Sequence, residues 1–329
     1  MKKSIISIII GLAIGLILII LWLVSFDFAH FDETLRSLKY QYVALAGLFY
    51  LLAYYIRSVR WNLLLKKQTI LSYKDTWLIS AAGNWLNYLI PIRAGEVVKA
   101  VLVKKLKSVS AVSVMPSIFI DKFFDTLGIF FVLLLIPFVG ISASKGLNLL
   151  IILLIIMFDI IFGILILAAT HRRRITYVLQ ILFGWLPARL RSKIDHLIVL
   201  FINGLNVFEH KRQVIVYAVL LTALGVLFDG LYFWLMFTAF NQDAGFLIVL
   251  FGYTLINLSY VLPQPPAQLG SNEWMMIIIF SLGFGLTRNT ASAIMVFAHL
   301  FTACIITVMG VLGFSYAGIR SVRQIKGEL

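Results

Sequence analysis

The sequence predicts an all-α integral membrane protein with about six full transmembrane helices and two re-entrant helical hairpins, arranged as inverted repeats. Three observations lead to this fold class. First, 61% of the 329 residues are hydrophobic, 13% are charged, and the mean hydropathy is +1.00, values that soluble proteins do not reach. Second, apolar runs of about 20 residues, enough to cross roughly 30 Å of hydrocarbon as a helix, recur along the whole chain. Third, Lys and Arg collect in alternate connecting segments.

Six apolar segments are predicted to cross the membrane: residues 4–26, 42–65, 113–140, 147–170, 214–240 and 291–317. The first segment is too long for the core of a signal peptide and is not followed by a small-residue cleavage pattern. Residues 171–212 mix basic and apolar side chains at helical spacing, which predicts helices lying on the membrane surface. This layout leaves no room for a water-soluble catalytic domain.

Two further apolar segments, residues 76–103 and 245–286, are each interrupted by a polar break that contains Pro and Gly. The arm that follows the first break is short and contains Lys99, so it cannot cross the membrane alone. Backbone freed at such a break is tolerated at membrane depth only when it is buried in protein or lines a wet cavity. We therefore predict two re-entrant hairpins. In the alternative interpretation every arm is a full span, which gives ten helices with the same sidedness.

The distribution of Lys and Arg predicts the sidedness of the spans. One face of the layout carries 21 of these residues, whereas the opposite face carries Arg36, Lys39, Lys145 and Arg288. By the positive-inside rule we expect a cell (cytoplasmic) membrane location with both termini cytoplasmic. Residues 1–329 then form a single polytopic domain whose halves, residues 41–140 and 213–317, are inverted repeats. Interrupted segments in corresponding positions of two halves indicate the midplane binding site of a transporter.

The first break contains residue types that suit an anionic head group. Pro91 ends one helix and Gly95 permits the turn into the next. Insertion of a charged side chain such as Arg93 into an apolar segment costs about 2.5 to 3.5 kcal/mol unless the side chain has a partner or contacts water. Its planar guanidinium can donate two parallel hydrogen bonds to a phosphate. The alternative is an internal ion pair between Arg93 and Glu96, with Glu96 serving as a helix cap. The candidate binding residues of this break are Asn87, Arg93, Glu96 and Lys99.

The second break repeats the order Asn, Pro, Gly, Glu and ends at Gly270 and Glu273. Gln264 and Gln268 carry amides that bind a head group without charge, or that satisfy the ends of the flanking helices. The candidate binding residues of this break are Gln264, Gln268 and Glu273.

Several charged residues lie within the predicted spans. Asp121 and Asp125 share one helix face, with Lys122 beside them; they either pair with the cations of the first break or form an interfacial charge cluster. Asp159 and Asp229 lie deep in apolar segments, where a carboxylate is costly and is a candidate proton relay or counter-charge. His299 is expected to be a packing or hydrogen-bonding residue rather than a titrating one.

These residues resemble the transmembrane region of lysylphosphatidylglycerol synthases and their stand-alone flippase-like relatives. The family motif Pro-x-Arg-x-Gly-Glu is matched from Pro91 to Glu96, and the Glu-Arg-x-x-Asp motif appears here from Asp121 to Asp125 with conservative changes. The second hairpin departs further, because Ala267 and Gln268 replace two glycines of a Pro-Gly-Gly-x-Gly-x-x-Glu pattern. The resemblance implies translocation of a lipid head group between leaflets. Since no aminoacyl-transferase domain follows, we do not expect the chain to synthesise the lipid.

The sequence thus favours a lipid flippase or scramblase in which Arg93 and Lys99 neutralise a phosphate where the hairpins meet. Two other classes stay open: a membrane-embedded polyprenyl-sugar glycosyltransferase or lipid-modifying enzyme that uses Asp32 and Glu33, and a small-molecule secondary transporter. Hydrolase and zinc-protease motifs are absent from the sequence, and we expect no enzymatic activity, metal or cofactor. Membrane lipids are the expected partners and nucleic acid is not; a homo-oligomer and a separate lipid-modifying synthase remain alternatives.

Overall fold

The computed structural model describes residues 13, 15–24, 26–90, 94–107, 109–133, 156, 187, 192, 212–260 and 264–318. All regular structure within these ranges is helical, and they contain no strand. Several parts of the predicted layout lie outside the described residues. They include residues 4–12 of the first span, residues 91–93 of the first break with Arg93, residues 134–140 of the third span, all of the span 147–170 except residue 156, with Asp159, nearly all of the surface segment 171–212, and residues 261–263 of the second break.

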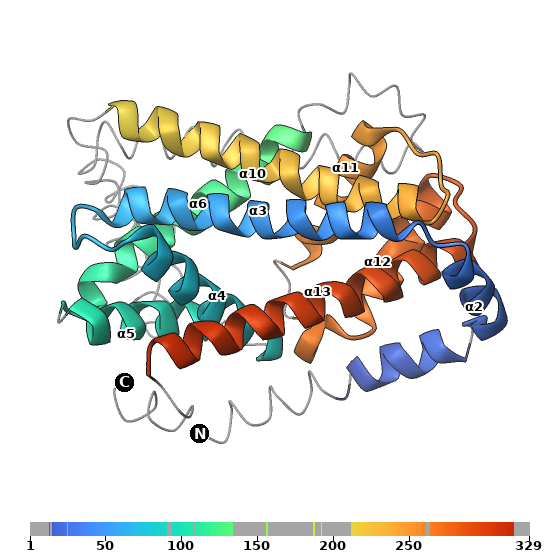
Figure 1. Ribbon diagram of the computed structural model, residues 1–329, viewed down its shortest axis with the longest axis horizontal. Helices are drawn as coiled ribbons and strands as arrows, with labels where there is room; N and C mark the ends of the chain where they lie inside the picture. Colours follow the sequence, from blue (N-terminus) through green and yellow to red (C-terminus); the bar gives the residue numbers. More distant parts are fainter. Residues whose placement is uncertain are drawn as a thin grey trace.

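Three long helices run along the long axis of the molecule: α3 (Tyr40–Leu65), α10 (Arg212–Ala239) and α13 (Arg288–Tyr316) (Figure 1). With 26 to 29 residues each, they extend about 39 Å or more at 1.5 Å per residue. In the described part of the chain these three helices are long and apolar enough to cross a membrane. They agree within three residues with the predicted spans 42–65, 214–240 and 291–317.

The helix α6 (Ala111–Leu133) corresponds to the described part of the predicted span 113–140 and packs against α3, α5, α10 and α11. It contains three charged residues, Asp121, Lys122 and Asp125. Near the N-terminus, residues 15–23 are helical within the predicted span 4–26, and the short helix α2 (Phe28–Arg36) follows.

The first predicted break separates two helices that pack against each other, α4 (Tyr73–Leu89) and α5 (Gly95–Lys107). A capping box between Ser72 and Asp75 starts α4. At 17 and 13 residues the two helices are about 25 and 20 Å long, each shorter than the roughly 30 Å of a hydrocarbon core. The helix α5 continues to Lys107, past the predicted end at residue 103, because Lys favours helix and its charge suits a helix C-terminus.

The second predicted break follows α11 (Phe246–Ser259) and contains the 3₁₀ turn η3 (Pro266–Gln268). The chain becomes helical again in α12 (Ser271–Met276), which continues directly into the π-helix η4 (Ile277–Gly283). Ala267, Gln268 and Gly270 have φ angles of 52°, 58° and 78°, so the turn back toward α12 is made by left-handed backbone. All three positions are those at which the resembling family has glycine, the residue that adopts this conformation without strain, and this chain keeps only Gly270.

The two interrupted pairs lie at opposite ends of the molecule. In Figure 1, α4 and α5 lie at one end, whereas α11 and α12 lie toward the end that carries α2. The buried core divides in the same way. One cluster includes Trp61 of α3 and Leu86 of α4, and another includes Phe237 of α10 and Phe280 of η4. Each interrupted pair therefore packs in its own apolar cluster, and α3 and α13 contribute to both.

Candidate functional site

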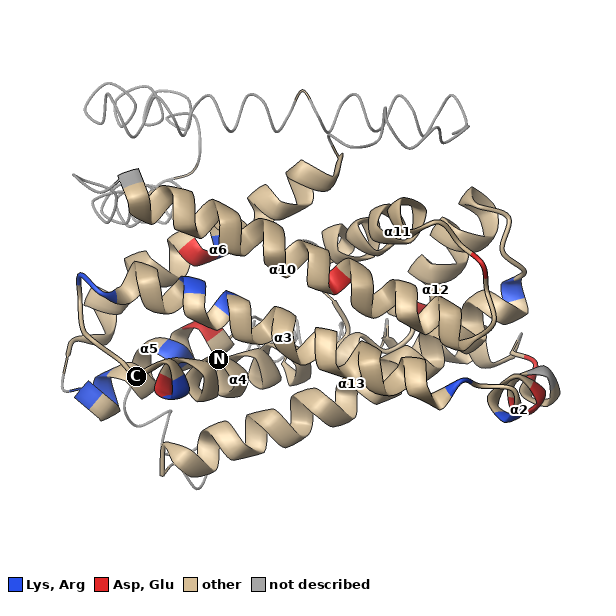
Figure 2. Ribbon diagram, turned by 45° about the horizontal axis from the view of Figure 1, so that its top comes forward, with Lys and Arg blue, Asp and Glu red and all other residues tan. Residues whose placement is uncertain are grey.

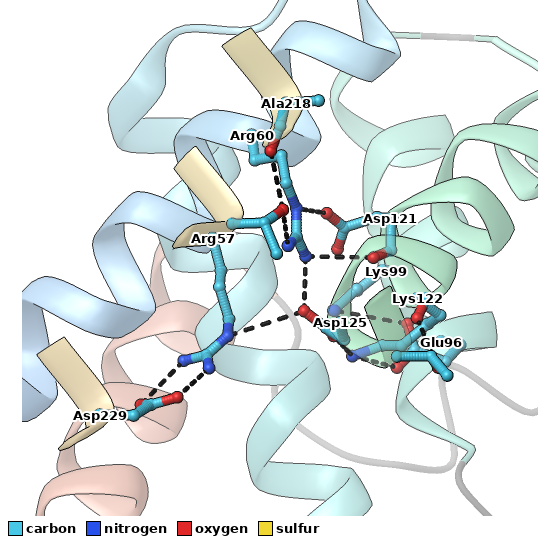
Figure 3. A network of polar contacts seen from close by, with 11 residues as sticks. Arg57, Arg60, Glu96, Lys99, Asp121, Lys122, Asp125, Ala218 and Asp229 are labelled. Atoms are coloured by element: carbon cyan, nitrogen blue, oxygen red, sulfur yellow. Dashed lines mark hydrogen bonds and ion pairs between the residues drawn. The ribbon is translucent and has the colours of Figure 1, made fainter. Parts of the chain in front are cut away.

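A continuous chain of ion pairs joins four helices inside the molecule (Figure 3). It contains four cations and four carboxylates: Arg57 and Arg60 of α3, Glu96 and Lys99 of α5, Asp121, Lys122 and Asp125 of α6, and Asp229 of α10. We call these eight residues the ion network. Its formal charge is zero when every member is ionised, which is the condition under which charges are tolerated in a low-dielectric interior.

Arg60 lies at the centre of the ion network, and its side chain is only 1% exposed. Its Nε donates to Oδ1 of Asp121 at 2.8 Å, its Nη2 donates to Oδ1 of Asp125 at 2.5 Å, and its Nη1 donates to the hydroxyl of Thr222 at 3.0 Å. The fork of one guanidinium thereby ties α3 to α6 and α10, which suits a structural role.

Arg57 lies one turn before Arg60 and is 29% exposed. Its two Nη atoms donate to the two carboxylate oxygens of Asp229, and its Nε lies 3.6 Å from Oδ1 of Asp125. The predicted counter-charge Asp229 is thus the partner of an arginine in the helix packed beside it.

The first break is closed by contacts around Asn87 and Glu96. The backbone N–H of Gly95 donates to Oδ1 of Asn87 at 2.8 Å, and Nδ2 of Asn87 donates to Oε1 of Glu96 at 3.0 Å. Lys99 lies 3.3 Å from Oε2 of Glu96 and 5.6 Å from the ring centroid of Trp61, and its side chain is 5% exposed. Three of the four candidate residues of the first break therefore contact one another, within or beside the ion network.

Lys122 connects the first break to α6. Its Nζ lies 3.0 Å from Oδ2 of Asp125 and 3.5 Å from Oε1 of Glu96. With 39% of its side chain exposed, it resembles Arg57 rather than the buried Arg60 and Lys99. Within the ion network, Lys122 and Arg57 are the two cations whose side chains are partly exposed.

The two interrupted pairs meet at His299 of α13. Its Nε2 lies 3.0 Å from the hydroxyl of Tyr88, near the end of α4, and 2.8 Å from the carbonyl oxygen of Ala267 in η3. Its Nδ1 lies 2.6 Å from Oε1 of Glu273 in α12. One imidazole therefore contacts both breaks, and we call Tyr88, Ala267, Glu273 and His299 the junction.

The candidate amides of the second break make contacts within that break. Nε2 of Gln264 donates to the carbonyl oxygen of Ser259 at 2.6 Å, and Oε1 of Gln268 accepts from Nδ2 of Asn272 at 3.1 Å. Asp32, a candidate for the rival enzyme, is 62% exposed and pairs with Arg36 one turn later. No three His, Cys, Asp or Glu side chains in the described ranges lie close enough to hold a metal ion.

Comparison with known proteins identifies the family. A family model described as the lysylphosphatidylglycerol synthase TM region matches residues 8–310. The chain belongs to this family. It is similar to a UPF0104 membrane protein of Methanocaldococcus jannaschii, at 26% identity over 82% of this chain and 83% of that protein. A UPF0104 membrane protein of Methanothermobacter thermautotrophicus is 24% identical over 93% of this chain and 92% of its own length. No solved structure matches the chain.

The two family motifs lie at the contacts described above. As a member of the lysylphosphatidylglycerol synthase TM-region family, with membrane proteins as its relatives, the chain is a membrane protein whose polar residues lie among apolar helices. Gly95 and Glu96 of the first family motif start α5 and contact Asn87, whereas Asp121 to Asp125 of the second motif lie in the ion network. Motifs separated by 25 residues of sequence thus form one site.

Sequence reasoning does not identify three residues of these sites: Arg57, Arg60 and Tyr88. Arg57 and Arg60 lie within the predicted span 42–65, and α3 continues past them through Trp61 to Leu65, a signal that they lie inside the helix. The hydrogen-bonding role expected of His299 agrees with its contacts, whereas Tyr88 is not among the candidate residues. Their partners are distant in sequence, so no local pattern could have identified the junction.

Proposed function

We propose that this protein is a lipid flippase or scramblase that moves an anionic or phosphate-containing lipid, aminoacylated or glycosylated head groups included, between the leaflets of the cell membrane. The proposal includes six full spans with both termini cytoplasmic. It also includes two re-entrant hairpins, one formed by α4 and α5 and opening to the cytoplasm, the other formed by α11, η3, α12 and η4 and opening outside. The family membership and the three apolar helices support a membrane role.

The single observation that carries the proposal is the contact between breaks from opposite ends, through Tyr88, His299 and Ala267. Irregular backbone at membrane depth is expected only around a protein-lined or wet site. Two short interrupted segments that meet from opposite sides are the arrangement that transporters use to bind a substrate near the midplane.

The ion network supplies the charge chemistry that a lipid phosphate needs. An unpaired phosphate in hydrocarbon is prohibitively expensive, so a cation of the protein must shield it. We assign this role to Lys122 and Arg57, because both are partly exposed and both share Asp125. When a phosphate takes the place of the Asp125 carboxylate at these cations, Asp125 keeps its contact with Arg60, so that no carboxylate is left unpaired.

The charge balance also fits a single anionic substrate. The eight residues of the ion network sum to zero, and we propose that Arg93 of the family motif, which lies outside the described residues, adds one positive charge. A phosphodiester carries one negative charge, so the occupied site is neutral. In this scheme the acyl chains stay in the bilayer while only the head group enters, which limits the polar surface that must be desolvated.

A liposome assay tests the proposal. The purified protein is reconstituted, and the exchange of tail-labelled fluorescent phosphatidylglycerol between leaflets is followed by quenching from outside, with phosphatidylcholine in parallel. We expect the protein to accelerate the exchange of phosphatidylglycerol. We expect Lys122→Gln to slow it about tenfold or more, since a hydrogen bond to a charged group contributes about 1.5 to 3 kcal/mol.

The matched control is Lys105→Gln, which removes an exposed lysine at the end of α5 and should leave the rate unchanged. Exchange by Lys122→Gln at the rate of the unmodified protein would contradict the assigned binding residues. Failure of the unmodified protein to move any lipid would contradict the function. A lipid-modifying activity that depends on Asp32 would then favour the enzyme interpretation.

A further inference from the structure

The Glu273–His299 pair has a buried geometry that the proposed binding of a phosphate does not use. Both side chains are 6% exposed, and His299 of the pair contacts both interrupted helix pairs, outside the ion network. Oε2 of Glu273 is buried and makes no hydrogen bond within the described part of the chain. A buried carboxylate oxygen without a donor is costly unless the carboxylate binds a proton or a cation.

The contacts of His299 determine how many protons the pair holds. A carbonyl oxygen cannot donate, so the 2.8 Å contact with Ala267 requires a proton on Nε2. The 2.6 Å contact between Nδ1 and Glu273 also requires one proton between the two atoms. That proton makes His299 an imidazolium beside a carboxylate, or it resides on Glu273 beside a neutral imidazole. In both cases the pair carries one proton more than a neutral imidazole with a carboxylate.

Removal of that proton must break a contact at the junction. A neutral imidazole has one N–H, which can serve Glu273 or the carbonyl of Ala267 but not both. If Nδ1 keeps its proton, the lone pair of Nε2 accepts from the hydroxyl of Tyr88 at 3.0 Å but repels the carbonyl oxygen of Ala267 at 2.8 Å. If Nε2 keeps its proton, the lone pair of Nδ1 faces the carboxylate. Deprotonation therefore loosens η3 or α12 from α13, the helix that also holds Tyr88 of α4.

The other ionisable groups around the pair do not compensate for this loss. They are Tyr88 of α4 and, near Tyr88 or Glu273, Tyr54 of α3, Tyr260 of α11 and the thiol of Cys304 of α13. The tyrosine hydroxyls are uncharged near neutral pH. Tyr54 also interacts with Arg57 and Asp229 of the ion network. The proton is therefore the charge that sets the state of the junction, and a tyrosine lies between it and the ion network.

We infer that Glu273 and His299 form a proton-binding site that links lipid movement to the movement of a proton. The pair takes a proton from water on one side of the membrane, which closes the junction, and releases it to water on the other side when the junction opens. This coupling rests on the proposed function, whereas the protonation of the pair does not. In this scheme Glu273 binds the proton whose movement is coupled to that of the lipid, and it does not contact the lipid.

Histidine NMR tests the proton site without any transport. The chain has five histidines, and the ¹⁵N signals of His299 are assigned as those lost in His299→Gln. We expect Nε2 to be protonated near neutral pH and the pair to lose one proton at alkaline pH. In Glu273→Gln the new amide donates to Nδ1, so Nε2 should stay protonated with no titration linked to position 273. A bare Nε2 with the proton on Nδ1, across the whole pH range, would overturn the site.

A transport measurement tests the coupling. Liposomes with an imposed pH gradient and the membrane potential clamped should accumulate fluorescent phosphatidylglycerol in one leaflet, with a limit of about tenfold per pH unit for one proton per lipid. Glu273→Gln should abolish the accumulation, whereas Glu33→Gln, at an exposed carboxylate of α2, should retain it. Lipid movement by the unmodified protein that ignores the pH gradient would overturn the coupling while leaving the proposed function intact.

Discussion

Arg60 and Asp121 form a buried ion pair that joins α3 to α6: Nε of Arg60 donates to Oδ1 of Asp121 at 2.8 Å, and its Nη2 donates to the backbone carbonyl of Asp121 at 3.1 Å. Both side chains are less than 10% exposed. Removing one partner of such a pair leaves an uncompensated charge in the interior and typically costs about 3 to 5 kcal/mol.

This pair gives the first prediction, on stability. Arg60→Met should lower the thermal unfolding temperature of the detergent-solubilised protein strongly, because Asp121 loses its principal donor. The double variant Arg60→Met with Asp121→Leu should recover much of the loss, since apolar side chains of similar volume replace a buried pair at little cost. The single variant Asp121→Leu is measured as well. If the double variant lowers the unfolding temperature by the sum of the two single-variant decreases, the two residues do not act as a pair.

The second prediction concerns the close crossing of α4 and α5. A Cβ atom added to Gly95 would lie 1.9 Å from the carbonyl oxygen of Gly83, and backbone cannot move aside as a flexible side chain does. Gly95→Ala should therefore separate the two helices, lower the unfolding temperature and abolish lipid exchange. Gly225→Ala in α10 is the control, because its added Cβ meets side chains at 3.9 Å. An unfolding temperature for Gly95→Ala equal to that of the control would show that the crossing is not tight.

The third prediction concerns pH and the contact between α4 and α13. Partial burial alone would raise the pKa of Asp75, but hydrogen bonds that the Tyr316 hydroxyl and the Ser72 backbone N–H donate to its carboxylate outweigh burial and hold the pKa below its ordinary value. A carboxyl group with a lowered pKa in the folded state stabilises above its unfolded pKa, near 3.9, and this contribution is lost as the pH falls through the folded value.

The variant Tyr316→Phe isolates that contribution. We expect it to unfold at a lower temperature than the unmodified protein at pH 6 to 7, with a difference that shrinks below about pH 4, where the carboxylate becomes protonated. Thermal unfolding in detergent across this range measures the difference. An equal difference at pH 3 and pH 7 would mean that Tyr316 acts through packing rather than through the carboxylate.

The parts of the fold that depend on local composition were predictable from the sequence. The spans at α3, α10 and α13 follow from apolar length, and the break between α4 and α5 follows from Pro91 and Gly95, since these residues act on their own backbone. The helical limits differ by a few residues because capping, as by Ser72 and Asp75, and the helix propensity of Lys104 to Lys107 extend the helices beyond the apolar runs.

The candidate site was predictable only in part, because its chemistry arises from contacts between distant segments. The sequence indicated that Asp121 and Asp125 need cations, but it could not select Arg60, which lies 61 residues before Asp121. It also could not indicate that Lys99, which pairs locally with Glu96, packs over the ring of the distant Trp61 rather than lying open. A tertiary contact such as that of Tyr88 with His299, 211 residues apart, has no signature in either local sequence.

The charge distribution in Figure 2 separates two places where an anionic lipid could bind: the exposed lysines of the α5 end, and the charged residues within the bundle. The most direct measurement is therefore photo-crosslinking in nanodiscs with a phosphatidylglycerol that carries the reactive group on its head group, followed by peptide mapping. We predict adducts on α3 around Arg57 and on α6 around Lys122, which Lys122→Gln reduces and Lys105→Gln does not. Adducts confined to Lys104, Lys105 and Lys107, with none inside the bundle, would contradict the proposal that the head group enters the ion network.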